Sequence, residues 1–154
     1  MTYTDNELTL STAQAITSGA TIASEESIDL TTSPDMGNGR GFAAQISATT
    51  VPAGNSVATV TFDLVTSAAT GLGTPRVIGS SGPIPVADLT ATSPPIVVRP
   101  NPANQALPVD GVTERYLGIV YTPDASPTSG NFSATLVLDP APRVSYYPAG
   151  SVIA

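Results

Sequence analysis

The chain has 154 residues, which is enough for one domain with a single hydrophobic core. Five Lys+Arg against 12 Asp+Glu give a formal net charge of −7. This balance disfavours nucleic acid and anionic membranes as partners, because both bind clustered positive charge. The chain contains no His, Cys or Lys, which removes the usual general base, the thiolate and the Schiff-base amine. We therefore expect no enzyme, no metal site and no other cofactor.

The hydrophobic core must be light, since 41% of the residues are hydrophobic but only 5% are aromatic. Part of the stability is therefore expected to come from association with a partner. The first residues, MTYTDNELTL, carry neither a basic segment nor an apolar run, so we expect no signal peptide. No stretch approaches the ~18 apolar residues that a membrane helix needs. We expect a soluble protein.

The pattern divides the chain into an N-terminal arm at 1–6, a β-sandwich at 7–139 and a C-terminal extension at 140–154. The arm and the extension have no core-forming period. The extension also carries three prolines, which oppose regular structure.

Strands are predicted in the first half of the chain where apolar and polar residues alternate. Short strands are expected at 7–10 and 28–31, with a loop at 18–26 between them. Longer alternating runs at 41–48 and 58–64 are interpreted as the two strands of a hairpin.

Prolines and glycines separate the strands expected in the middle of the chain. A strand is predicted at 76–79, with a loop at 80–85. A further strand at 96–99 lies between prolines, which favours an edge position because proline cannot donate to a sheet ladder.

The clearest alternation runs from 113 to 139 and is interpreted as a long antiparallel hairpin. Its first strand, around 116–121, is apolar on both faces, which favours a central position in its sheet or a second contact surface. Its second strand, 131–139, is apolar on one face only. With about eight strands in total, the sequence predicts an all-β fold, an antiparallel β-sandwich or jelly roll.

Two features resemble catalytic or ligand-binding motifs. Glu25 and Glu26 could form a carboxylate pair of the kind that glycosidases use, but solvated surface charges are the favoured interpretation. The glycine-rich DMGNGRG at 35–41 lacks the GK[ST] ending of a phosphate loop and the spacing of a calcium loop, so it is interpreted as a turn.

Several charged and aromatic residues are candidates for an interface with a partner. Arg115 either forks to a carboxylate of a neighbouring subunit or pairs within its own chain, and the sequence leaves both open. Tyr146 and Tyr147 either anchor a partner or pack back on the sandwich. The residues predicted at the interface are Tyr3, Asp5, Arg115, Arg143, Tyr146, Tyr147, Val152 and Ile153.

Four segments together resemble the jelly-roll capsid cement proteins of tailed bacteriophages, of the Bordetella phage type. They are NELTLSTAQAIT, DMGNG, GVTERYLGIVY and GNFSATLVLD, and the resemblance covers about residues 6–139. The chain departs from that family in its tail after Asp139 and in a longer loop region at 71–105.

The resemblance implies a structural protein on the outer surface of a virion capsid. Such proteins are homo-oligomers that tie neighbouring major capsid protein subunits together, and on a lattice a trimer is expected more than a dimer. The alternative is a carbohydrate-binding module that contacts host glycans, although the chain has no Trp for a sugar platform. A glycosidase is the third candidate.

Overall fold

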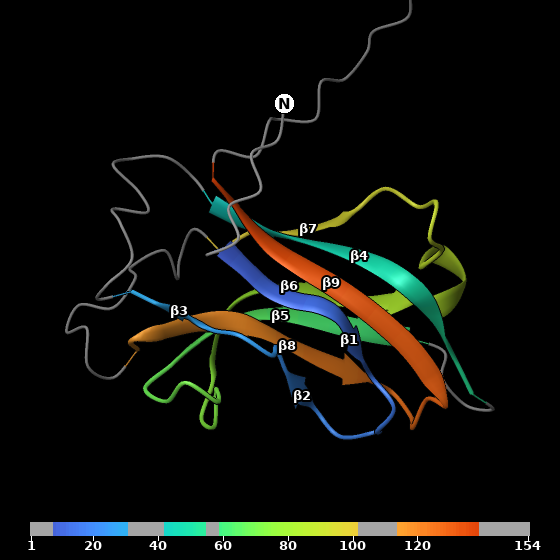
Figure 1. The fold of residues 1–154 in the computed structure, drawn as a ribbon, viewed down its shortest axis with the longest axis horizontal. Helices are drawn as coiled ribbons and strands as arrows, with labels where there is room; N and C mark the ends of the chain where they lie inside the picture. The colour runs from blue at the N-terminus through green and yellow to red at the C-terminus, as the bar shows by residue number, and fades with distance from the viewer. Residues whose placement is uncertain (1–7, 31–41, 55–58, 102–113, 139–154) are drawn as a thin grey trace, which may run out of the picture.

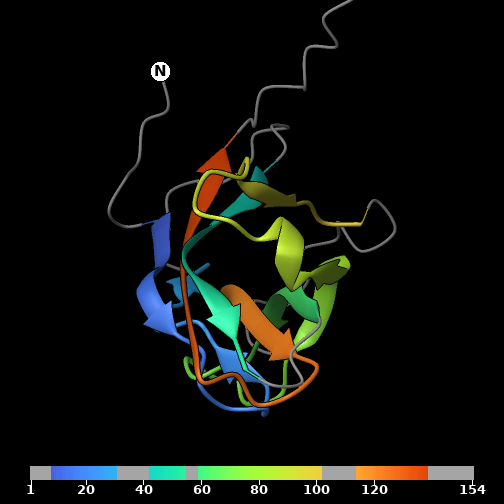
Figure 2. The same ribbon diagram turned by 90° about the vertical axis from the view of Figure 1, so that its right-hand side faces the viewer.

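The computed structural model describes residues 8–30, 42–54, 59–101 and 114–138. Within these residues, nine strands form two antiparallel sheets that pack face to face (Figures 1 and 2). The four-stranded sheet has the order β1 (Thr9–Ala15), β9 (Ser129–Leu138), β4 (Phe42–Ala53) and β7 (Ile96–Val98). In the five-stranded sheet, β2 (Ile22–Ala23) and β3 (Ile28–Asp29) both pair with β8 (Tyr116–Pro123), followed by β5 (Thr59–Ser67) and β6 (Arg76–Pro85).

The chain passes repeatedly from one sheet to the other. β1, β4, β7 and β9 lie in one sheet, and the strands between them in sequence lie in the other. This arrangement is a jelly roll, which confirms the predicted fold class. The structure has nine strands rather than about eight because two short strands, β2 and β3, share one side of β8.

Both predicted hairpins are wrong. β8 and β9 lie in different sheets, and so do β4 and β5. Alternation shows which face of a strand is buried, but two strands that face the same core from opposite sheets have the same alternation as a hairpin. The consecutive strands that do pair are β5 and β6.

Two strand boundaries also differ from the prediction. β6 continues to Pro85 through the expected loop at 80–85, and β2 lies inside the expected loop at 18–26. β6 accommodates its prolines because it is an edge strand. A register shift in β5–β6 is bridged by Ser81, whose Oγ accepts a hydrogen bond from the Phe62 N–H at 3.0 Å.

Two predicted strand positions are confirmed. β7 lies at the edge of the four-stranded sheet, and it is followed directly by Arg99 and Pro100. β8 lies inside the five-stranded sheet with neighbours on both sides. Between β6 and β7, the segment Val86–Asp88 forms the short 3-10 helix η2. No helix among the described residues is long and apolar enough to span a membrane.

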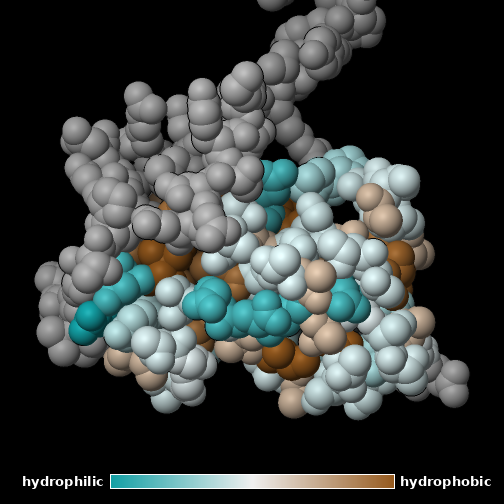
Figure 3. All heavy atoms as spheres, in the orientation of Figure 1, coloured by the Kyte–Doolittle hydropathy of each residue, from teal (hydrophilic) through white to brown (hydrophobic). Residues whose placement is uncertain are grey.

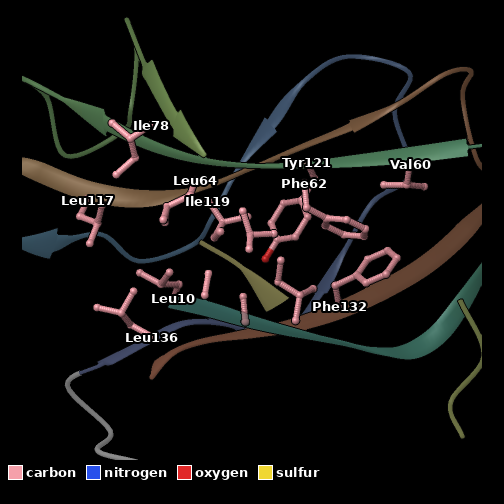
Figure 4. Close-up of a cluster of buried hydrophobic side chains, with 14 of the residues drawn as sticks. Leu10, Val60, Phe62, Leu64, Ile78, Leu117, Ile119, Tyr121, Phe132 and Leu136 are labelled. Carbon is pink, nitrogen blue, oxygen red and sulfur yellow. The ribbon is translucent and has the colours of Figure 1, made fainter. Parts of the chain in front are cut away.

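The core lies between the two sheets and is centred on three aromatic rings (Figure 4). The Phe62 and Phe132 ring centroids are 5.1 Å apart, and the Tyr121 ring lies 5.9 Å from Phe62 and 6.0 Å from Phe132. Phe62 and Tyr121 come from the five-stranded sheet and Phe132 from the other, so these contacts hold the sheets together.

The buried Tyr121 hydroxyl is satisfied by a chain of polar side chains from β1. It donates to Ser11 Oγ at 2.9 Å, Ser11 Oγ donates to Gln14 Oε1 at 2.7 Å, and Gln14 Nε2 donates to the Ala23 carbonyl at 2.7 Å. Burial raises the pKa of Tyr121 to about 12, although the hydrogen bond with Ser11 opposes this shift. This series of hydrogen bonds links the two sheets on the side of the molecule where β1 and β2 lie.

Candidate interface

An ion pair ties the start of β8 to β3. The Arg115 Nε donates to both carboxylate oxygens of Asp29, at 2.9 and 3.0 Å, and Nη2 donates to Oδ2 at 2.5 Å. The guanidinium carbon also lies 5.2 Å from the centroid of the Tyr116 ring. The carboxylate that Arg115 binds therefore belongs to the same chain, as in the intrachain alternative.

A second ion pair lies beside the first. Glu114 pairs with Arg76 at the start of β6, and its Oε2 accepts a hydrogen bond from Thr66 Oγ1 at 3.1 Å. Because Glu114 and Arg115 are neighbours in sequence, the two pairs connect β3, β5 and β6 to the start of β8.

Within each pair, the positive charge of the arginine is balanced by the negative charge of its carboxylate partner. The hydrogen bond with Asp29 raises the pKa of Arg115, and partial burial opposes the shift. The side chains of Arg76 and Arg115 are 41% and 42% exposed, so water screens both pairs and each contributes little to stability. The pairs orient charged groups at the surface, with no excess positive charge that would attract an anion.

Arg115 is the one predicted interface residue that falls within the described part of the chain. Tyr3, Asp5, Arg143, Tyr146, Tyr147, Val152 and Ile153 lie outside the described residues. Sequence reasoning missed Asp29 and Arg76, which lie 86 residues from Arg115 and 38 residues from Glu114. No local pattern links residues so far apart, because only the strand order brings them together.

Glu25 and Glu26 lie between β2 and β3, and both are exposed. Glu25 Oε2 accepts a long hydrogen bond of 3.4 Å from the Thr12 N–H. Across residues 8–30, 42–54, 59–101 and 114–138, no group of three or more Asp, Glu, His or Cys residues is placed to hold a metal ion.

The outer surface of the four-stranded sheet carries short, uncharged side chains. One row crosses all four strands in register, from Thr9 through Thr135 and Gln45 to Val97. Ser133 and Ser47 form the next row. We call these six residues the hydroxyl face. No strand of this sheet contains a charged residue. On this side of the molecule, Figure 3 shows pale atoms of intermediate hydropathy together with a band of teal, hydrophilic atoms.

The outer surface of the five-stranded sheet is partly covered by the loop between β5 and β6. Leu72 is 3% exposed and packs with Val65 and Val120, although its neighbours Gly71 and Gly73 are exposed. A Cβ on Gly118 would lie 2.5 Å from the Leu72 Cδ1, so only glycine leaves room for this side chain. The second apolar face of β8 is therefore filled from within the chain.

The chain also matches a known protein family. The Bbp16 family matches residues 10–136, which include every strand except the first residue of β1 and the last two of β9. The chain belongs to the Bbp16 family. The family name suggests a protein of a Bordetella phage, which agrees with the phage type that the sequence resembles. No curated protein matches the chain.

Proposed function

We propose that this Bbp16-family protein is a capsid cement protein. It binds the outer surface of a bacteriophage head and stabilises contacts between subunits of the major capsid protein. Its role is mechanical, with no reaction and no cofactor. The observation that carries the proposal is the family match over residues 10–136, whose name suggests a phage protein.

The surface of the jelly roll supports this proposal. The hydroxyl face is a sheet surface of short side chains, and such a surface approaches another protein with little loss of side-chain entropy. The ion pairs of Arg115 and Arg76 lie on the other sheet and orient charged groups there. The molecule thus offers two chemically different surfaces to neighbouring subunits.

Glycan binding has less support among the described residues. Sugar platforms use exposed aromatic rings, but Phe42, Phe62, Tyr121 and Phe132 are all buried. Tyr116 is partly exposed, and the Arg115 guanidinium lies against its ring. An array of bacterial glycans tests this alternative, and specific binding there would favour it over the cement role.

Co-sedimentation with capsids tests the proposed function directly. Purified protein is mixed with phage heads that lack it, and heads that already carry it serve as the control. We expect saturable binding to the undecorated heads, little binding to the decorated ones, and greater resistance of the bound heads to heat. Failure to sediment with undecorated heads would contradict the proposal.

A further inference from the structure

We propose that the loop 68–75, between β5 and β6, is a latch. It opens while the sandwich stays folded, and it thereby uncovers an apolar site on the outer surface of the five-stranded sheet. Leu72 is the side chain that closes the site, which is lined by Val65, Val120, Ala23 and Tyr116. The proposal goes beyond the capsid role, because it concerns a movement of the isolated chain.

One side chain of the loop is buried against the sheet. Leu72 is 3% exposed, whereas every other residue from 68 to 75 is exposed. The Leu72 N–H donates to the Ala69 carbonyl at 3.0 Å, and the Ala69 N–H donates to Ser67 Oγ at 3.2 Å. Both hydrogen bonds lie within the loop and the last residue of β5, so they can persist when the loop moves. Opening therefore costs the burial of one side chain and neither of these bonds.

The closed position of Leu72 is strained. Its φ is +53°, in the left-handed region that residues with a Cβ rarely adopt. This strain and the gain from burying a leucine side chain are of the same order of magnitude and opposite in sign. The neighbours Gly71 and Gly73 are exposed and have open space around them, so the backbone has the freedom to move. The open state should therefore be populated on the order of 1%.

The site beneath Leu72 is separate from the main core. Val65 and Val120 form a second cluster with Leu72, whereas their neighbours in sequence, Leu64 and Ile119, belong to the cluster between the sheets. Successive side chains of a strand point to opposite faces of its sheet. The site can therefore open to water on one face while the core on the other face stays packed.

Gly118 controls how deeply Leu72 sits in the site. A Cβ at this position would lie 2.5 Å from Leu72 Cδ1 and 2.9 Å from Ser24 Oγ. The end of the Leu72 side chain is the flexible part of this contact, and it withdraws when the loop opens. Gly118→Ala should therefore shift the latch toward the open state while the rest of the apolar lining is kept.

Thiol labelling of the full chain tests the proposal. Val65→Cys reports on the latch, and Leu64→Cys is the matched control, because both native side chains are 0% exposed but lie on opposite faces of β5. Each protein is labelled at several denaturant concentrations below its unfolding transition, and circular dichroism confirms that it is folded. A local opening exposes little surface, so its rate depends weakly on denaturant, whereas global unfolding depends on it steeply.

We expect Val65→Cys to be labelled at least about tenfold faster than Leu64→Cys without denaturant, and with the shallower dependence. Adding Gly118→Ala to Val65→Cys should raise the labelling rate about fivefold, whereas Thr70→Ala, an exposed position in the same loop, should leave it unchanged. Capsids play no part in these measurements, so the capsid role and the latch can fail separately. Equal rates with equal denaturant dependence for Val65→Cys and Leu64→Cys would overturn the proposal. So would a Val65→Cys rate that Gly118→Ala does not raise.

Discussion

The two sheets of this jelly roll differ in the described residues that lie on their outer surfaces. On the five-stranded sheet, Leu72 fills the space above Gly118, and two arginines are paired with carboxylates of the same chain. On the four-stranded sheet, the outer rows are uncharged hydroxyl and amide side chains with an exposed valine at one end. Among the described residues, the outer surface of the five-stranded sheet is thus filled by side chains from the loop between β5 and β6 and by ion pairs, whereas that of the four-stranded sheet carries uncharged polar side chains.

The core lies beneath both outer surfaces. Removing a large core side chain should therefore lower the free energy of unfolding more than any other change considered. Phe132→Ala removes a fully buried ring that contacts Phe62 and Tyr121 across the sandwich. We expect the free energy of unfolding to fall by about 3 to 5 kcal/mol. The control is Thr135→Ala on the hydroxyl face, which should change it by less than about 0.5 kcal/mol. Denaturant unfolding measures both, and equal effects would contradict the assigned faces.

Removing the cover of the five-stranded sheet should have a smaller effect. Leu72→Ala empties a buried site. The backbone at this position stays at φ +53, which is strained for alanine as it is for leucine. We expect a loss of about 2 kcal/mol, below the loss for a central core residue. Gly118→Ala should act similarly, because its Cβ would displace Leu72. Thr70→Ala, in the same loop, is the control. No change for either Leu72→Ala or Gly118→Ala would show that the loop does not cover the sheet.

Tyr121 should make the protein less stable at high pH. Its pKa is raised to about 12 in the folded state, so between about pH 10 and 12 the folded state holds a proton that the unfolded state has lost. Stability is therefore fully present below about pH 10 and should fall by about 2 kcal/mol as pH rises to about 12.

The comparison protein for this measurement is Tyr121→Phe. It should lose about 1 kcal/mol at neutral pH, because the hydrogen bond with Ser11 is removed. It should also show a smaller decline above about pH 10. Unfolding curves from pH 8 upward give both quantities, and parallel declines in the two proteins would rule out Tyr121 as the cause.

The smallest effect is expected at the ion pairs. Asp29→Asn removes the charge of the Arg115 partner, but the Arg115 side chain is 42% exposed and water already screens the pair. We expect no measurable change in the unfolding midpoint, at low or high salt. A clear loss of stability that salt abolishes would mean that the pair contributes to the fold of the five-stranded sheet.

The sequence predicted which face of a strand is buried better than it predicted which strands pair with each other. The alternation around Phe132 correctly placed its side chain on the buried face of its strand. The apolar character of both faces of the strand around 116–121 favoured a central position or a second contact surface, and β8 does lie inside its sheet. The same alternation gave the wrong pairing for β8 and β9, because two strands on opposite sides of one core share a pattern. β2, with two residues, is too short to show a period.

The candidate interface was only partly predictable for a similar reason. Arg115 was identified because a cation next to Glu114 and Tyr116 is a distinctive local combination. Its partner Asp29 lies on a strand of two residues that only the jelly-roll order brings beside β8. The hydroxyl face was not identified at all, since its rows form from four strands that are far apart in sequence.

Thiol labelling tests the difference between the two sheets most directly, because the chain has no cysteine of its own. Ser47→Cys and Leu72→Cys are each mixed with a thiol reagent under native conditions, and the rate of labelling is compared with the rate in denaturant. Ser47 is exposed on the four-stranded sheet, whereas Leu72 is 3% exposed against the five-stranded sheet. The account predicts rapid labelling of Ser47→Cys and strong protection of Leu72→Cys. Equal labelling rates for the two folded proteins would contradict it.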